Sequence, residues 1–162
     1  MMIREMTDMD SFRVLDIYRM GLETGNATFE TSVPTWMDWD LKHLKHSRFV
    51  YIENNNILGW VSLSPVSTRK VYEGVAEVSI YIDINNLGRG IGSKLMGKVI
   101  ESSEKHGIWT LYSSVFPEIT ATLKLHHKFG FRTIGVREKI ARLDGKWRDT
   151  VLLERRSKIV GL

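Results

Sequence analysis

The 162-residue sequence contains no cysteine and only three prolines. Without cysteine there can be no disulfide, no thiolate nucleophile and no cysteine-ligated metal, a composition typical of a reducing, cytoplasmic compartment. No apolar run approaches the roughly 20 residues that a membrane-spanning helix needs. Residues 1–6 lack a basic region followed by an apolar core, so we expect no secretory signal and no membrane partner.

Positive charge is not concentrated in one place either, although the formal net charge is +4. The densest basic run is 155–158, Arg-Arg-Ser-Lys, which we interpret as a solvated tail. Nucleic-acid-binding proteins usually gather lysine and arginine on one face, so we expect no nucleic-acid partner. A mildly basic surface also suits a ligand that carries phosphates.

Hydrophobic periodicity predicts a single domain, residues 1–162, in which strands and helices alternate irregularly. Strands are predicted over 2–6, 49–53, 57–63, 75–82 and 110–116, with a final pair around the Asp144–Gly145 turn. Helices are predicted from the Thr7–Asp10 N-cap region to Gly25, and over 35–46, 90–106 and 118–129. The final hairpin favours an α+β class over a doubly wound parallel fold.

The most informative segment is the alternating strand 75–82 followed by Leu87-Gly-Arg-Gly-Ile-Gly92 at the start of a helix. Glycines at 88, 90 and 92 remove side chains that would keep a phosphate from the backbone N–H groups, and the helix directs its unpaired N–H groups to the same point. The pattern therefore predicts a phosphate site. Three glycines alone have a plainer interpretation, a turn that caps a packed helix.

In this context the segment resembles the signature of the GNAT superfamily of acetyl-CoA-dependent N-acetyltransferases, Gln/Arg-x-x-Gly-x-Gly/Ala between a strand and a helix. The chain is further similar to the phosphinothricin acetyltransferase-type branch, which includes methionine sulfoximine and methionine sulfone acetyltransferases. The similar segments are 27–31, 76–82, 125–131 and 145–149, and the resemblance covers nearly the whole chain. It implies a GNAT-like fold, with a central mixed, mostly antiparallel twisted sheet and helices on both faces.

The sequence departs from this family pattern at three positions. Leu87 replaces a usual Gln or Arg, Ile119 replaces a common coenzyme-contacting Asn, and Ser67 replaces a frequent Arg. The first two concern the coenzyme and the third concerns the acceptor.

The resemblance implies transfer of acetyl from acetyl-CoA directly to the primary amine of a small amino-acid-like acceptor of the phosphinothricin, methionine sulfoximine or methionine sulfone type. No covalent enzyme intermediate is required, because the thioester is already activated. We also predict a homodimer, although no sequence pattern fixes the oligomeric state. His43, His46 and His106 have no partners at ligand spacing, so we predict no metal site.

The resemblance also assigns roles to particular residues. Glu77 would take the proton of the amine through an ordered water, and burial would raise its pKa toward the useful range. His126 would protonate the departing thiolate. The coenzyme residues implied are Ile80, Tyr81 and Ile82 on the strand, Gly88, Arg89, Gly90, Ile91, Gly92 and Ser93 in the turn, and Thr122 one helical turn before His126. The acceptor residues implied are Phe29, Arg69 and Tyr72, with Arg69 pairing with an acid group.

Each assignment has a plainer alternative. Glu77 could face water at an edge or pair with an arginine, and His126 could be a packing or surface residue. Arg69 and Tyr72 could be a solvated charge and a core aromatic. For the whole chain, the alternatives are a peptide or protein N-terminal acetyltransferase, a non-catalytic CoA-binding module and, more remotely, another nucleotide-binding module.

Overall fold

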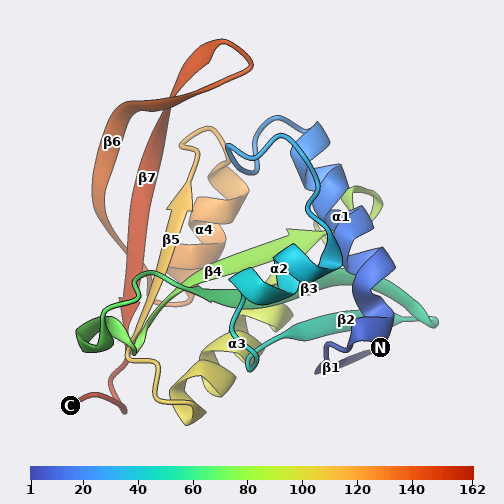
Figure 1. The fold of residues 1–162 in the computed structure, drawn as a ribbon, viewed down its shortest axis with the longest axis horizontal. Coiled ribbons are helices and arrows are strands. Elements are labelled where there is room, and N and C mark those ends of the chain that lie inside the picture. The colour runs from blue at the N-terminus through green and yellow to red at the C-terminus, as the bar shows by residue number, and fades with distance from the viewer.

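The computed structural model describes residues 1–162 and shows a seven-stranded sheet with helices on both of its faces (Figure 1). The elements in chain order are β1 (Met2–Glu5), α1 (Ser11–Glu23), α2 (Trp36–Lys42), β2 (Phe49–Glu53), β3 (Asn56–Pro65), β4 (Val75–Ile82), α3 (Ile91–Lys105), β5 (Thr110–Val115), α4 (Thr120–Lys128), β6 (Arg132–Leu143) and β7 (Lys146–Arg156). The predicted strands and helices are thus confirmed, except that the helix predicted over 35–46 ends earlier. The α+β class is also confirmed.

The spatial order of the strands is β1-β2-β3-β4-β5-β7-β6. Every neighbouring pair is antiparallel except β4 and β5, which run parallel. The prediction of a mixed, mostly antiparallel sheet is therefore confirmed. No helix of the chain is long and apolar enough to cross a membrane.

Side-chain alternation along the strands builds a core on each face of the sheet. Phe49 and Tyr51 belong to a cluster with the apolar stripe of α3, whereas Val50 between them packs with Val14 of α1 and Trp39 of α2. α1 and α2 therefore cover one face and α3 the other. This arrangement decides which helices each side chain of β4 meets.

The predicted helix over 35–46 is shorter than expected, because α2 ends at Lys42. His43 is already extended (φ −105°, ψ 148°). The guanidinium of Arg48 donates to the main-chain carbonyls of Asp40, His43 and Leu44 at the end of this helix. Because the Arg48 side chain satisfies these carbonyls, the helix can end here and the chain can turn back toward β2.

The basic run 155–158 is not a solvated tail, so that interpretation was wrong. Arg155 lies in β7, and its Nη1 is 3.0 Å from Oε1 of Glu104 in α3. Ser157 is buried and its hydroxyl donates to the same carboxylate oxygen at 2.8 Å. The run ties the end of β7 to α3, a long-range contact that the local sequence does not reveal.

The two parallel strands separate after a short stretch, and this split matters most for function. β4 pairs with β3 along Ala76–Ile82, but with β5 only at Val75–Glu77. Figure 1 shows β4 and β5 diverging beyond that point. The β5-side backbone groups of residues 78–82 thus have no strand partner. Buried backbone groups need partners, so this edge is prepared to bind a ligand.

Candidate active site

A cavity of about 1080 Å³ fills the opening between β4 and β5. Its wall continues over the start of α3, along α4 and under the segment that joins α1 to α2. The predicted site residues that line it are Phe29, Glu77, Ile80, Tyr81, Ile82, Gly88, Arg89, Gly90, Ile91, Gly92, Ser93, Thr122 and His126. Residues predicted from separate segments are thus brought to one cavity.

The glycine turn has the geometry of an anion cradle. Gly88 (φ +74°) and Gly90 (φ +75°) are left-handed, a conformation that favours glycine, and a Cβ on either residue would project into open space. α3 begins directly after Gly90, and no side chain caps its first turn. Its N-terminal N–H groups are therefore free to bind an anion.

Gly92 has a different reason to be glycine. A Cβ there would lie 3.2 Å from the Leu125 side chain of α4. The missing side chain lets α3 and α4 approach each other at the floor of the cavity. Only the first two glycines of the motif are therefore explained by the shape of the turn.

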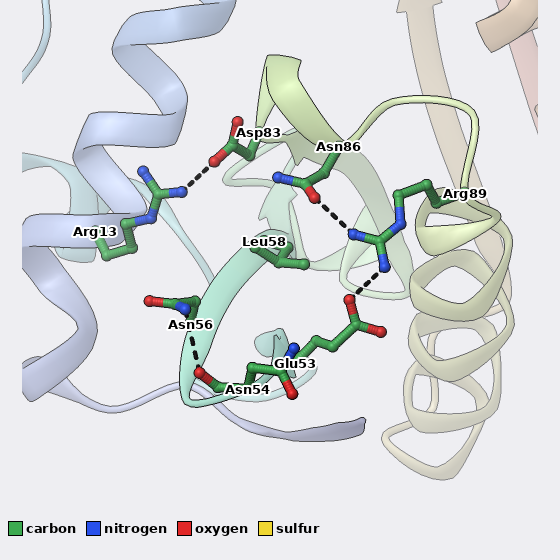
Figure 2. A pocket seen from close by; sticks show the side chains of 8 residues that line it. All are labelled: Arg13, Glu53, Asn54, Asn56, Leu58, Asp83, Asn86 and Arg89. Atoms are coloured by element: carbon green, nitrogen blue, oxygen red, sulfur yellow. Dashed lines mark hydrogen bonds and ion pairs between the residues drawn. The ribbon is translucent and has the colours of Figure 1, made fainter.

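Arg89, between the two left-handed glycines, is held by two polar side chains. Its Nη1 donates to Oδ1 of Asn86 at 2.6 Å, and its Nη2 pairs with Glu53 (Figure 2). In the same polar hollow, Asp83 accepts from the backbone N–H of Asn85 at 2.8 Å and pairs with Arg13. These contacts hold the turn within the protein, so the cradle is organised before a ligand arrives.

Glu77 is half-buried, and its carboxylate makes no hydrogen bond or ion pair within the protein. It projects to the α1/α2 side of the sheet and stands opposite Ser64 of β3 in the strand register. Burial raises the pKa of this carboxyl group, and the positive charge of Lys42 acts in the opposite direction. Neither plainer interpretation applies, because Glu77 is on an inner strand and has no arginine partner. A carboxylate of this kind is suited to accept a proton.

His126 is buried and connects α4 to β5. Its Nδ1 lies 2.7 Å from the carbonyl oxygen of Thr122, which can only accept, so Nδ1 carries the hydrogen. Its Nε2 lies 2.8 Å from the hydroxyl of Ser113 and accepts from it when the ring is neutral. Burial lowers the pKa of the ring, which favours that neutral form. In the neutral ring, Nε2 is therefore occupied as an acceptor by the Ser113 hydroxyl.

Ser113 itself was missed from the sequence. It alternates in β5 with Leu111 and Val115, which are both buried, and it lines the cavity. A lone polar residue on the apolar face of a strand is the signal that could have identified it.

Phe29 reaches the cavity through an aromatic contact that the sequence did not predict. Its ring meets Phe116 edge-on at 5.0 Å, and the Arg148 guanidinium lies 4.1 Å from the centre of the Phe116 ring. Arg148 also donates to the carbonyl of Gly25 at 3.0 Å and to Oδ1 of Asn26 at 2.9 Å. Arg148 of β7 thus holds the segment between α1 and α2, which lines the cavity.

Arg69 and Tyr72 are the two predicted site residues that do not line the cavity. Both are exposed, and the guanidinium of Arg69 lies 5.4 Å from the centre of the Tyr72 ring. The structure places them against each other, before β4. Their contact with an acceptor stays a prediction.

Histidines gather at one place away from the cavity. The rings of His46 and His106 stack 4.2 Å apart, with 3° between their planes. No group of three or more histidine, cysteine, aspartate or glutamate side chains is arranged to hold a metal ion.

Comparison with known proteins gives three results. The acetyltransferase (GNAT) family matches residues 13–131. The chain is 34% identical to YwnH of Bacillus subtilis, over 88% of this chain and 90% of that protein. It is 30% identical to the phosphinothricin N-acetyltransferase of Alcaligenes faecalis, over 94% of this chain and 81% of that protein.

A solved structure agrees in fold. The phosphinothricin acetyltransferase of Sinorhizobium meliloti, in complex with acetyl-CoA, superposes with a TM-score of 0.90 at 21% identity. The match covers 99% of this chain and 90% of that one.

Proposed function

This chain belongs to the acetyltransferase (GNAT) family, and we propose that it transfers acetyl from acetyl-CoA to the amine of a small amino-acid-like acceptor. The transfer takes place in this cavity, with Glu77 as the base. The chain is an acetyl-CoA-dependent N-acetyltransferase. One observation carries the assignment of the site. The unpaired edge of β4 leads to the glycine cradle at one end and to an unpartnered carboxylate at the other, within a single cavity.

This geometry supports a proposal for the residues that hold the coenzyme. The free backbone groups of Ile80 and Ile82 are placed to bind the amide-bearing pantetheine arm, and the N–H groups from Gly88 to Ser93 are placed to bind the pyrophosphate. Because backbone groups do this work, the exposed Leu87 side chain leaves the cradle intact. This supports an active enzyme over a binding module that has lost turnover.

The transfer step needs a neutral amine. As the amine nitrogen forms its bond to the thioester carbonyl carbon and the C–S bond breaks, one proton leaves the amine and the coenzyme departs as a thiolate. Glu77 takes that proton, directly or through a water. No side chain becomes acetylated, which agrees with the absence of cysteine from the chain.

His126 has a smaller part in this scheme. Its neutral ring has no proton on Nε2 to give, and that atom already accepts from the Ser113 hydroxyl. A thiolate is also a stable leaving group at neutral pH, because thiols have pKa values of about 8.5. We therefore propose that His126 chiefly positions Ser113 and α4.

The acceptor side is lined by the segment between α1 and α2, including Phe29, and is supported by Arg148. An acceptor of the phosphinothricin type agrees with the name of the Alcaligenes relative. Methionine sulfoximine and methionine sulfone, expected from the sequence, belong to the same class of amino acids. A peptide N-terminus is the second candidate, since its α-amine would meet Glu77 in the same way.

A homodimer and a cytoplasmic location complete the proposal. Val136 and Ile140 of β6 and Trp147 of β7 are exposed on the final hairpin, which supports an interface between two copies. The cysteine-free composition supports the location.

The experiment that tests the function is an assay of free thiol released from acetyl-CoA. The amines would be phosphinothricin, methionine sulfoximine, methionine sulfone and a short peptide with a free N-terminus. Release that depends on an amino acid supports the proposal. Release with the peptide alone would replace it with the second candidate.

A further inference from the structure

The walls of the cavity contain few cationic side chains. Of the lysines and arginines, only Lys42 and Arg89 line it. Arg89 is at the coenzyme end and is paired with Glu53. Lys42, at the acceptor end, makes no hydrogen bond or ion pair within the protein. It is the one cation of the cavity that is free to bind a ligand.

The neighbours of Lys42 show why its ammonium group stands alone. Lys45 and Arg48 both pair with Asp40, the latter at 2.5 Å. His43 stacks on Trp39, and burial lowers the pKa of its ring to about 4, so it is neutral at physiological pH. The other basic groups of this segment are thus neutralised or uncharged.

Lys42 is on the same side of the sheet as the proposed base. It is the last residue of α2, which packs through Trp39 on the face of β3 and β4 that carries Glu77. The two groups line one cavity, and the positive charge of Lys42 acts to lower the pKa of Glu77. A small ligand can therefore meet both at once.

Acidic side chains make this cation more significant. Glu30, Asp38 and Glu77 line the same cavity, and each of these carboxylates repels an acid group when it is ionised. An acceptor with an acid group is bound favourably only where a cation offsets this repulsion. Lys42 is the only lysine or arginine that lines this end of the cavity.

We propose that Lys42 binds an acid group of the acceptor while the acceptor amine lies at Glu77. This inference rests on the proposed function and specifies its substrate class, an amine that also carries a carboxylate or phosphinate. It differs from the expectation drawn from the sequence, in which Arg69 pairs with that group. Arg69 lies outside the cavity and stacks on Tyr72 instead.

The test compares two acceptors that share the same amine. L-methionine sulfone carries an α-carboxylate, and its primary amide replaces that group with a neutral one. In Lys42→Met, we expect kcat/KM for the acid to fall roughly ten- to a hundredfold, as for the loss of a charge-assisted hydrogen bond, mainly through KM. For the amide, the change should be less than about threefold on the same reasoning.

Matched variants separate this role from others. Lys42→Arg should retain most of the activity with the acid, because the charge is kept. Lys45→Met removes an exposed lysine that does not line the cavity, and it should leave kcat/KM unchanged for both the acid and the amide. Arg69→Met tests the alternative cation in the same assay. L-Phosphinothricin and its α-carboxamide, which keeps the phosphinate, are compared in the same way. The comparison shows whether Lys42 binds the carboxylate or the phosphinate.

Two results would overturn the inference while the proposed function stands. One is an equal loss for acid and amide in Lys42→Met, which would mean that Lys42 acts through Glu77 or the fold. The other is a selective loss in Arg69→Met but not in Lys42→Met. A wild-type protein that acetylates none of these amines would instead refute the proposed function itself, and the inference with it.

Discussion

Replacement of Glu77 by glutamine is the sharpest test of the catalytic assignment. Glutamine has nearly the same shape as glutamate but cannot accept a proton at neutral pH. The carboxylate has no hydrogen-bond or ion-pair partner in the protein, so the substitution breaks no contact. A positioned base contributes about 10²–10⁴ in rate, so we expect kcat/KM at pH 7 to fall by that factor.

The pH dependence of the loss can be worked out from the amine. A peptide α-amine with a pKa of about 7.8 is roughly one-seventh neutral at pH 7, and the amine of a free amino acid is neutral to a smaller extent, because its carboxylate stabilises the ammonium form. Raising the pH should therefore restore part of the lost rate through deprotonation in solution. The remaining loss reflects proton removal during bond formation and should persist. Rates of release of free thiol, measured from pH 6 to 9 for both proteins, would show this.

Thermal stability separates loss of chemistry from loss of fold. Burial raises the pKa of Glu77 in the folded protein above its unfolded value, so the folded state binds the proton more tightly. Stability from this group is present below the unfolded pKa and is lost as the pH rises through the folded pKa. At pH 7 the carboxylate therefore disfavours folding, and Glu77→Gln should melt at the same or a higher temperature.

The expected result is thus a variant that is at least as stable, binds acetyl-CoA normally and is far less active. Full activity at pH 7 would refute the role of Glu77 as the base. A large fall in melting temperature would contradict the burial argument, because no partner of Glu77 would explain it.

The remaining predictions concern the cradle, His126 and Arg148. Gly90→Asn and Gly90→Asp both tolerate a left-handed backbone, but only aspartate adds charge where the pyrophosphate would lie, so acetyl-CoA should raise the melting temperature of the asparagine variant more than that of the aspartate variant. Equal shifts in melting temperature for the two variants would refute the proposal that the pyrophosphate binds at this turn. His126→Gln should lower the melting temperature by disturbing the link from Thr122 to Ser113, while kcat falls less than about tenfold because a thiolate departs unaided; a larger fall in a folded variant would make His126 the acid. Arg148→Met should raise KM for the acceptor and leave KM for acetyl-CoA unchanged in steady-state assays, since its shorter hydrogen bonds, to Gly25 and Asn26, hold the segment between α1 and α2, and its ion pair with Glu118 before α4 is longer, at 3.3 Å. A matching rise for acetyl-CoA would show that this segment also orders the coenzyme end.

Local sequence was sufficient wherever one element determines its own geometry. Alternation along 75–82 predicted the strand and placed Glu77 on one of its faces. The glycines predicted the turn, and Gly88 and Gly90 do have the left-handed conformation that only glycine adopts freely. Element identity and the cradle were therefore predictable.

Sequence was insufficient where distant segments determine a position. The end of α2 depends on Arg48, which donates to carbonyls up to eight residues earlier. The segment between α1 and α2 is held by Arg148, 123 residues after Gly25. Whether Lys42 or Arg69 lies in the cavity depends on such contacts, and no local periodicity encodes them.

The division of labour along β4 follows from strand geometry. Its backbone edge beyond Glu77 faces the gap to β5, while the side chains of Glu77, Ser79 and Tyr81 project toward α1 and α2. The coenzyme and the acceptor can thus approach one strand by different routes, one along the peptide groups and one over the side chains, and meet where β5 separates from β4. Direct transfer needs only this meeting point. In the proposed scheme, acceptor choice depends on side chains of the α1–α2 region, including Lys42, which can change without disturbing the backbone groups proposed to hold the coenzyme.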